Sequence, residues 1–396
     1  MASRSLVSQV KHTKLIYNTY FYIGSSFVKL LKKFVKPNNK LIVFSSFSGK
    51  SYDDSPRALY EGMIKDHRFD DYELVWDFRD PQKYNIERGA KIKTDTLTYY
   101  STLLKARLWI TNVSMYRGLE FTGINSYVFN TWHGSAIKKI GIDVKGKDAF
   151  VGKTKQKRGN VILAQGKYDV EKFSHAYEMP RQSVLTFGFP RNDELVYNNK
   201  PDIINELKTH LGISSNKKVI LYAPTYREYQ RDNNKNSIFS LPINIGKWEE
   251  HLSNDFVILF RAHPEVVKVL NVVENDFVKD VSSYPHINEL MLMSDLLISD
   301  YSSIFFDYSI LGRPMLCFAY DYDRYDKERG VYFDIRKELA SENISDENTL
   351  LEAILKLDWK KSGNIAITFR NKYVETFGNA TDKSLDYLYE VLNKKD

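Results

Sequence analysis

The sequence has one cysteine, no acidic residue near its start and no long apolar segment. Cys317 lies in the apolar run Met315–Phe318, so a disulfide framework is excluded and a buried core thiol is predicted. A chain without disulfides fits a reducing cytoplasm. Low-complexity tracts and repeats with periods of roughly 20 to 50 residues are also lacking, which excludes a solenoid.

Negative charge is missing from the first part of the chain. No Asp or Glu precedes Asp53, whereas basic residues recur there, among them Arg4, Lys11, Lys14, Lys29, Lys32, Lys33, Lys36 and Lys40. Such a leader, assigned to residues 1–39, seeks an anionic surface. The stretch from Lys14 to Lys29 is too short and too polar to span a bilayer, and no secretory cleavage pattern follows it.

The leader also has an amphipathic pattern. On a helical wheel Phe27, Leu30, Leu31 and Phe34 share one arc and Lys29, Lys32, Lys33 and Lys36 the opposite one, which is typical of a helix lying in a membrane interface. The alternative is an ordinary helix docked on the protein with a solvated lysine face. Nucleic acid is not expected as a partner, because the basic residues carry no RNA-binding motif.

Beyond residue 40, short apolar runs alternate with helical patterns, as in doubly wound parallel sheets. The chain of 396 residues, 43% of them hydrophobic, can fill two cores. The first series predicts a domain over 40–200, with helices over Pro56–Asp66, Leu97–Lys105 and Val170–Tyr177 and strands over Leu41–Phe47, Tyr72–Phe78, Leu108–Val113, Tyr127–Thr131, Val161–Gln165 and Val184–Phe187.

The second series predicts a domain over 201–375, followed by a C-terminal helix over 376–396 that packs back on the first domain. Its predicted helices cover Ile203–Leu211, Gly246–Leu252 and Asn288–Met293, and its predicted strands cover Val219–Ala223, Phe256–Phe260, Phe277–Val281, Leu296–Ser299 and Met315–Phe318. The fold class is therefore α/β, with two Rossmann-like domains. Ligands of such sheets bind at the carboxyl ends of the strands.

Two adjacent hydroxyls follow one of these strands. Ser302 and Ser303 stand where Leu296–Ser299 turns into a helix-compatible stretch, so backbone N–H groups and hydroxyls could hold a phosphate there. The alternative is a plain N-cap serine.

A histidine follows another strand. His133 and Gly134 come directly after Tyr127–Thr131 and precede Lys138 and Lys139. A strand-end histidine beside a glycine is well placed as a general base, and the lysines could attract an anionic acceptor. Read alone, His133 is more often a structural residue.

Cationic groups follow two further strands of the second series. Val219–Ala223 runs into Pro224, Thr225 and Arg227, and Phe256–Phe260 runs into Arg261 and His263. Two arginines and a histidine near Ser302 and Ser303 suit a diphosphate with a leaving group that needs stabilisation. The alternatives are surface salt bridges and a turn histidine.

Two weaker patterns remain. Gly188–Asp193 follows a strand and places polar groups in a loop, although a simple turn explains it nearly as well. Asp321 and Asp323 have the spacing of a metal-binding pair, but further ligands are missing nearby. We therefore expect neither a metal nor another cofactor.

An ordered set of motifs resembles the CDP-glycerol glycerophosphotransferase family, which makes or primes teichoic acids in Gram-positive bacteria. The resemblance runs from about residue 40 to 390 and rests on Phe47–Pro56, His133-Gly134, Gly188–Asp193, Ala223–Arg227, Arg261–Pro264, Asp300–Ser303 and Arg329–Asp334. It departs from the family at Ser135-Ala136, where Thr-Pro is frequent, which puts acceptor preference in doubt.

The resemblance implies a GT-B-like architecture of two facing domains and a peripheral place at the cytoplasmic face of the membrane. It implies that His133 deprotonates the acceptor, with His263 as a second catalytic residue. The implied donor-binding residues are Pro224, Thr225, Arg227, Arg261, His263, Ile287 at the cytosine, Asp300, Ser302 and Ser303. The implied acceptor-binding residues are Gly134, Ser135, Lys138, Lys139, Arg191 and Asp193.

The predicted reaction is transfer of glycerol phosphate, or a similar alditol phosphate, from CDP-glycerol or CDP-ribitol to a lipid-linked saccharide or growing polymer, with release of CMP. An anionic membrane surface is the expected partner, and an oligomer is left open. One rival is a GT-B nucleotide-sugar glycosyltransferase, since the fold alone does not settle the reaction. A second is a non-catalytic polymer-binding or membrane-surface protein.

Overall fold

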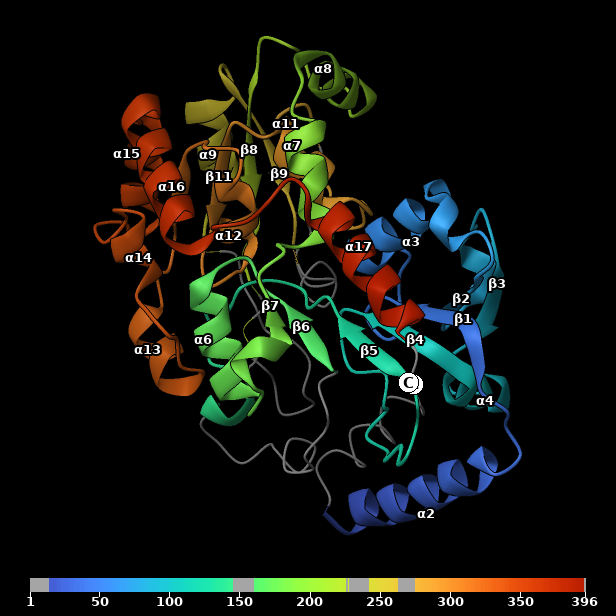
Figure 1. Ribbon diagram of the computed structural model, residues 1–396. Helices are drawn as coiled ribbons and strands as arrows, with labels where there is room; N and C mark the ends of the chain where they lie inside the picture. Colours follow the sequence, from blue (N-terminus) through green and yellow to red (C-terminus); the bar gives the residue numbers. More distant parts are fainter. Residues whose placement is uncertain (1–13, 145–159, 226, 228–241, 263–274, 395–396) are drawn as a thin grey trace. The chain divides into compact units, whose positions relative to one another are not determined.

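The structure is a computed structural model that describes residues 14–144, 160–225, 227, 242–262 and 275–394. The chain forms two compact units (Figure 1). The first comprises Met1–His133, Gly141–Arg191 and Asn379–Asp396, and the second comprises Gly134–Ile140 and Asn192–Gly378. The chain therefore passes between units directly after His133.

The first unit is built on a parallel sheet in the order β3-β2-β1-β4-β5-β6-β7. Its strands are β1 Asn38–Ser45, β2 Glu73–Phe78, β3 Ala90–Lys93, β4 Ala106–Thr111, β5 Tyr127–Asn130, β6 Val161–Leu163 and β7 Val184–Leu185. Its helices are α2 Lys14–Lys32, α3 Asp54–Lys65, α4 Leu97–Lys105, α6 Lys167–Ala176 and α17 Ala380–Asn393. Short 3₁₀ turns cover His67–Phe69, Pro81–Lys83, Gly141–Asp143, Arg181–Ser183 and Pro190–Asp193.

The second unit is built on a parallel sheet in the order β10-β9-β8-β11-β12. Its strands are β8 Lys218–Tyr222, β9 Phe256–Phe260, β10 Val278–Asp280, β11 Leu296–Ser299 and β12 Met315–Cys317. Its helices are α7 Glu194–Tyr197, α8 Pro201–His210, α9 Ile245–Leu252, α11 Ile287–Met293, α12 Ile304–Ser309, α13 Tyr322–Glu328, α14 Ile335–Glu338, α15 Glu347–Leu355 and α16 Trp359–Tyr373.

In each sheet the order of the strands changes direction at one point, although all paired strands run parallel. In the first sheet β1 pairs with both β2 and β4, and in the second β8 pairs with both β9 and β11. β9 is buried along its whole length and β1 over its last five residues, as expected of parallel strands covered on both faces, whereas the edge strand β3 is mostly exposed. In an open α/β sheet the carboxyl ends at such a switch point form the ligand-binding edge. The expected α/β class with two doubly wound sheets is confirmed.

The C-terminal helix belongs to the first unit. α17 packs against α3 (Figure 1). The hydroxyls of Tyr387 and Tyr127 are hydrogen-bonded at 2.6 Å. Arg68 Nη1 donates to Asp386 Oδ1 at 2.8 Å. Residues more than 250 positions apart in sequence are thus joined in one unit.

The leader helix α2 is docked on the first unit by one face. Tyr17 and Val28 are 5% and 2% exposed, and Leu31 and Val35 are partly buried against the same core, which also contains Leu103 and Trp109. The hydroxyl of Tyr20 donates to the carbonyl of Arg117 at 2.7 Å. The wheel placed Leu31 with Phe27, Leu30 and Phe34, but Leu31 faces the core, because the buried stripe follows Tyr17, Val28 and Val35.

Candidate active site

His133 lies just beyond β5, on a backbone that its neighbours constrain. Thr131 N–H donates to the carbonyl of Thr111 at 2.7 Å, which continues the β4–β5 pairing past the end of the strand. Trp132 N–H donates to Asn130 Oδ1 at 2.9 Å, and Trp132 has the left-handed φ of 55°. A non-glycine residue in this region is strained. The strain sets the direction in which the chain carries His133 away from the sheet.

The imidazole of His133 is held by a hydrogen bond and two rings. Nδ1 lies 2.9 Å from the carbonyl oxygen of Asn112. A carbonyl can only accept, so Nδ1 carries a hydrogen, and in the neutral ring the lone pair is on Nε2. The ring centroids of Trp132 and Phe47 lie 4.3 Å and 6.2 Å from that of His133. A half-buried imidazole with a fixed tautomer has the chemistry of a general base.

The loop after β1 packs against this histidine in an unusual conformation. Phe47, Ser48 and Gly49 all have positive φ, at 47°, 58° and 74°. Phe47 N–H donates to Asn112 Oδ1 at 2.8 Å, and Arg79 N–H donates to the carbonyl of Gly49 at 2.7 Å. A Cβ at Gly49 would lie 2.3 Å from Thr94 Oγ1, so only glycine fits. Strained backbone thus gathers beside His133, as is frequent at functional sites.

The residues after His133 belong to the second unit. Lys139 N–H donates to the carbonyl of Gly330 at 3.0 Å, and Tyr332 N–H donates to that of Ile137 at 2.8 Å. Gly134 and Ser135 are buried, and Lys138 and Lys139 are half-buried. These four predicted acceptor-binding residues therefore lie in one segment that is held by the Arg329–Asp334 motif.

The side chain of Arg227, a predicted donor-binding residue, binds two carboxylates of the protein. Its side chain is 0% exposed. Nε and Nη2 donate to the two carboxylate oxygens of Asp321 at 2.7 Å and 3.0 Å, and Nη1 donates to Asp300 Oδ2 at 2.8 Å. Burial by itself lowers the pKa of the guanidinium, but the charge of Asp300 and the hydrogen bonds and charge of Asp321 outweigh it and raise that pKa. The guanidinium is thus bonded on both sides to carboxylates of the protein.

Asp300 is a hydrogen-bond centre at the switch point of the second sheet. It follows β11 and accepts from Thr225 N–H at 3.0 Å, from Thr225 Oγ1 at 2.6 Å and from its neighbour Tyr301 N–H at 2.7 Å, in addition to Arg227. Its side chain is 3% exposed. Asp300 therefore ties the loop after β8, which includes the half-buried Pro224, to the loop after β11.

Ser302 and Ser303 are half-buried and directly precede α12. Ser302 Oγ accepts from Ile304 N–H at 3.3 Å, whereas Ser303 stands at the N-cap position without a side-chain capping bond. Asn192 Nδ2 donates to Asp307 Oδ1 at 2.7 Å and so fastens α12. The alternative of an N-cap serine is thus partly met by Ser302, whose hydroxyl accepts a backbone N–H at the start of α12.

Arg261 supports the loop that leads into α11. Its Nη1 donates to the carbonyls of Val281 and Tyr284 at 3.2 Å and 2.7 Å. Ile287, the predicted cytosine contact, is the half-buried first residue of α11. His263, predicted as catalytic and donor-binding, lies outside the described residues. Arg261 and Ile287 therefore belong to connected segments at one edge of the second sheet.

Arg191 and Asp193 are both buried, at 8% and 5% exposed. Arg191 Nη1 pairs with Asp54 Oδ2 at 3.0 Å, and Arg191 N–H donates to Ser55 Oγ at 3.3 Å. Arg191 thus fastens its loop to the start of α3, which agrees with the simple-turn alternative better than with a contact to an acceptor.

Asp321, once weighed as half of a metal pair, accepts from Arg227 and from the Tyr301 hydroxyl at 3.0 Å. Among the described residues, no group of three or more His, Cys, Asp or Glu side chains is arranged to hold a metal ion. Sequence reasoning also missed Asn112. It lay inside the strand predicted over Leu108–Val113, and only the end of β4 at Thr111 reveals it as a loop residue.

Comparison with known proteins identifies relatives over nearly the whole chain. The family described as CDP-Glycerol:Poly(glycerophosphate) glycerophosphotransferase matches residues 27–389. A teichoic acid glycerol-phosphate transferase of Staphylococcus aureus (strain NCTC 8325 / PS 47) is 33% identical over 400 residues, which cover 96% of this chain and 97% of the relative. A teichoic acid poly(glycerol phosphate) polymerase of Staphylococcus epidermidis is 37% identical over 82% of this chain, but this chain spans only 46% of its length.

Solved structures agree with these sequence relationships. The wall teichoic acid polymerase TagF is similar with a TM-score of 0.84 at 30% identity, over 98% of this chain and 97% of that one. A histidine variant of the same polymerase, soaked with CDPG, is similar with a TM-score of 0.83. A UDP-GlcNAc 2-epimerase from Neisseria meningitidis reaches 0.55 at 13% identity over 88% of this chain and 99% of that one, which shows a shared fold alone.

Proposed function

Because the chain belongs to the CDP-glycerol:poly(glycerophosphate) glycerophosphotransferase family, we propose that it transfers glycerol phosphate from CDP-glycerol to a lipid-linked glycan or growing poly(glycerol phosphate). CMP is the product released. The observation that carries this proposal is the bond between His133 Nδ1 and the carbonyl of Asn112, which leaves the basic lone pair of the neutral ring on Nε2.

In the proposed mechanism His133 takes the proton from the acceptor hydroxyl as the oxygen attacks the β-phosphate of CDP-glycerol. The bond from that phosphorus to the bridging oxygen breaks, and CMP leaves with the electron pair. Phosphoryl transfer requires positioning and charge stabilisation more than covalent help. One base and a set of cationic groups are therefore sufficient.

The donor is proposed to bind at the carboxyl edge of the second sheet. Arg261, His263, Ser302 and Ser303 contact the diphosphate, and the backbone at Ile287 contacts the cytosine. Arg227 and Asp300 hold the loops of Thr225 and Ser302 in place instead of touching the donor, because Arg227 already pairs with both Asp300 and Asp321. A bound diphosphate would have to break those buried bonds.

The acceptor is proposed to lie along Gly134, Ser135, Lys138 and Lys139. A poly(glycerol phosphate) chain carries a negative charge on each unit, and the two half-buried lysines in the segment that follows His133 along the chain suit it. Arg191 and Asp193 shape the neighbouring loop. CDP-ribitol is the competing donor, and the donor comparison below distinguishes the two.

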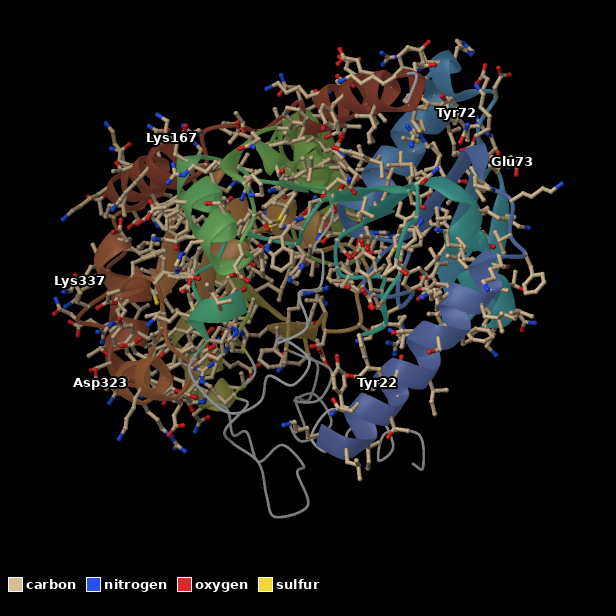
Figure 2. The ribbon with its side chains drawn as sticks, turned by 60° about the horizontal axis from the view of Figure 1, so that its bottom comes forward. Tyr22, Tyr72, Glu73, Lys167, Asp323 and Lys337 are labelled. Atoms are coloured by element: carbon tan, nitrogen blue, oxygen red, sulfur yellow. The ribbon has the colours of Figure 1, made fainter. Side chains whose placement is uncertain are left out.

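We propose that α2 rests on an anionic membrane at the cytoplasmic face. Its docked face leaves a second apolar stripe outside, with exposed fractions of 68% at Ile23, 42% at Phe27, 54% at Leu30 and 76% at Phe34. Tyr22, labelled on this helix in Figure 2, is 67% exposed. The exposed lysines Lys14, Lys29, Lys33 and Lys36 accompany the stripe.

Apolar side chains beside lysines are the pattern of an interfacial helix. Within the described part of the chain, no helix has the length and apolar character that crossing a bilayer requires. The docked-helix alternative and the membrane alternative are therefore compatible, since different faces of α2 serve them.

The proposed function is tested by the products made from one defined lipid-linked acceptor. The purified enzyme is incubated with CDP-glycerol, CDP-ribitol or a UDP-sugar, and the masses of the products are measured by mass spectrometry. We expect glycerol phosphate units to be added from CDP-glycerol, and His133→Ala to reduce turnover at least about a hundredfold while donor binding persists. Addition of a sugar without phosphorus would establish the glycosyltransferase alternative instead.

A further inference from the structure

The switch point of the first sheet carries an asparagine whose side chain the proposed mechanism does not use. Asn112 directly follows β4, next to the loop that leaves β1, and is 0% exposed. Ligand-binding loops of open α/β sheets leave the sheet at this place. A fully buried amide there must have its polar atoms occupied by the protein.

Asn112 contacts both the histidine and the strained loop beside it. Its backbone carbonyl accepts from Nδ1 of His133 at 2.9 Å, and its side-chain Oδ1 accepts from Phe47 N–H at 2.8 Å. Its Nδ2 lies 3.4 Å from Ser46 Oγ. One residue thus joins the imidazole to the loop whose Phe47 ring packs on that imidazole.

The hydrogen bond from Phe47 N–H to Asn112 Oδ1 holds a strained part of the loop. Phe47 has φ of 47° and Ser48 of 58°, a conformation that non-glycine residues keep only when their surroundings enforce it. The amide of Asn112 supplies such a contact from the neighbouring strand end. If it were removed, the loop could relax toward negative φ, and the Phe47 ring would lose its place against His133.

We propose that Asn112 is a positioning residue for His133: its carbonyl fixes the Nδ1–H tautomer, and its side chain fixes the Phe47 loop that packs on the ring. The inference rests on the proposed function, in which His133 is the base. It also explains why an amide rather than a carboxylate suits the position. Aspartate would accept the same N–H, but its charge would favour the imidazolium form and so disable the base at neutral pH.

The test is the pH dependence of kcat/KM for CDP-glycerol, measured on the full-length enzyme with a fixed acceptor. Asn112→Asp keeps an acceptor for Phe47 N–H, and we expect the low-pH limb to move upward by about one unit, with activity recovered at high pH. For Asn112→Ala we expect kcat to fall by roughly ten- to a hundredfold, while KM for CDP-glycerol changes little.

Asn160→Asp is the matched control. Asn160 Oδ1 also accepts a backbone N–H of the first sheet, that of Val128 at 3.0 Å, but near the start of β5 instead of beyond its end. The same charge is thus added beside another backbone N–H of the unit, at a residue that is exposed where Asn112 is buried. We expect its pH profile to match that of the unmodified enzyme.

The outcomes separate this inference from the function on which it rests. An Asn112→Asp enzyme that melts normally and keeps an unshifted low-pH limb would overturn the inference, provided that His133→Ala is inactive. An equal shift of the low-pH limb in Asn160→Asp would overturn it too, because a negative charge elsewhere in the unit would then have the same effect. If His133→Ala stayed active, the base itself would be wrong and the inference would fall with it. If Asn112→Ala does not fold, the inference is tested by the low-pH limb of the kcat/KM profile of Asn112→Asp.

Discussion

Arg227 and Asp300 form an ion pair that is almost completely removed from water. Nη1 of Arg227 lies 2.8 Å from Asp300 Oδ2, and the side chains are 0% and 3% exposed. Asp321 binds the other side of the same guanidinium at 2.7 Å. Ring centroids of Tyr301, Tyr320 and Tyr325 lie 4.9 to 5.4 Å from its central carbon. The cation is therefore part of the framework behind the proposed donor site.

Removing this cation should destabilise the second unit. Arg227→Ala leaves two buried carboxylates without their partner, so we expect a loss of about 3 to 5 kcal/mol in unfolding free energy, seen as a lower melting temperature. Arg336→Ala is the control, because its pair with Asp334 is partly exposed at 25% and 14% and should contribute no more than about 1 kcal/mol. Similar effects of the two substitutions would contradict the framework role.

Arg261 is expected to act on donor binding. Arg261→Ala releases the loop carbonyls of Val281 and Tyr284 and removes a proposed diphosphate contact, so CDP-glycerol should bind at least about tenfold more weakly in calorimetry. His263→Ala should behave alike.

Arg313→Ala provides the comparison for Arg261. Its Nη1 also donates to backbone carbonyls, those of Leu292 and Ser294 at 2.6 Å each, but Arg313 precedes β12 and so lies at the amino edge of the sheet. Its loss should lower the melting temperature without changing donor affinity. Equal donor affinities in Arg261→Ala, His263→Ala and the parent enzyme would remove these residues from the donor site.

Asp77 should make the stability of the first unit depend on pH. The side chain is buried, and this burial raises the pKa of its carboxyl to about 6 although Thr94 and Ser45 donate hydrogen bonds that lower it. The folded protein therefore holds this proton more tightly than the unfolded chain. The resulting stability is present below about pH 4, the ordinary pKa of Asp, and is lost as pH rises through about 6.

Asp77→Asn cannot titrate, so its melting temperature relative to the parent should rise between pH 4 and pH 7. A single group with this shift corresponds to about 1 to 3 kcal/mol. A difference between the two proteins that stays constant over the range would show that Asp77 is ionised throughout.

The exposed stripe of α2 should decide vesicle binding. Replacing Phe27, Leu30 and Phe34 together by Ser removes apolar groups that would be buried in lipid, so binding to vesicles with anionic lipid should weaken at least about tenfold. The melting temperature should fall only slightly, because Leu30 and Phe34 are mostly exposed and Phe27 has one edge contact with the ring of Tyr100. Binding of the parent protein should also weaken at high salt.

Leu355→Ser is the control for that stripe, because Leu355 is 54% exposed on α15 of the second unit. Point substitutions are preferable to deletion of the leader, because Tyr17 and Val28 of α2 belong to the core and their loss would expose it. If the Phe27, Leu30 and Phe34 substitutions leave vesicle binding unchanged, α2 is only a structural helix.

The sequence by itself determined the elements and the edge at which the site lies. Apolar runs of strand length predicted β9 and β11 with the ends that the structure shows. The helix predicted over Leu97–Lys105 is α4. The strand β3, Ala90–Lys93, was missed because it is a short edge strand whose residues are mostly exposed, so it lacks an apolar pattern. Polar residues directly after strands were recognisable because parallel strands end at one edge.

Only the tertiary structure decided which of these polar residues remain accessible. Arg227, Arg261 and Arg191 look alike in sequence, yet the first is paired with two buried carboxylates, the second supports a loop and the third pairs with Asp54. Asn112 looked like part of a strand, yet it holds both His133 and Phe47. The partners named here lie between 20 and 137 positions away along the chain. Such distant pairings arise from packing, which local sequence pattern does not encode.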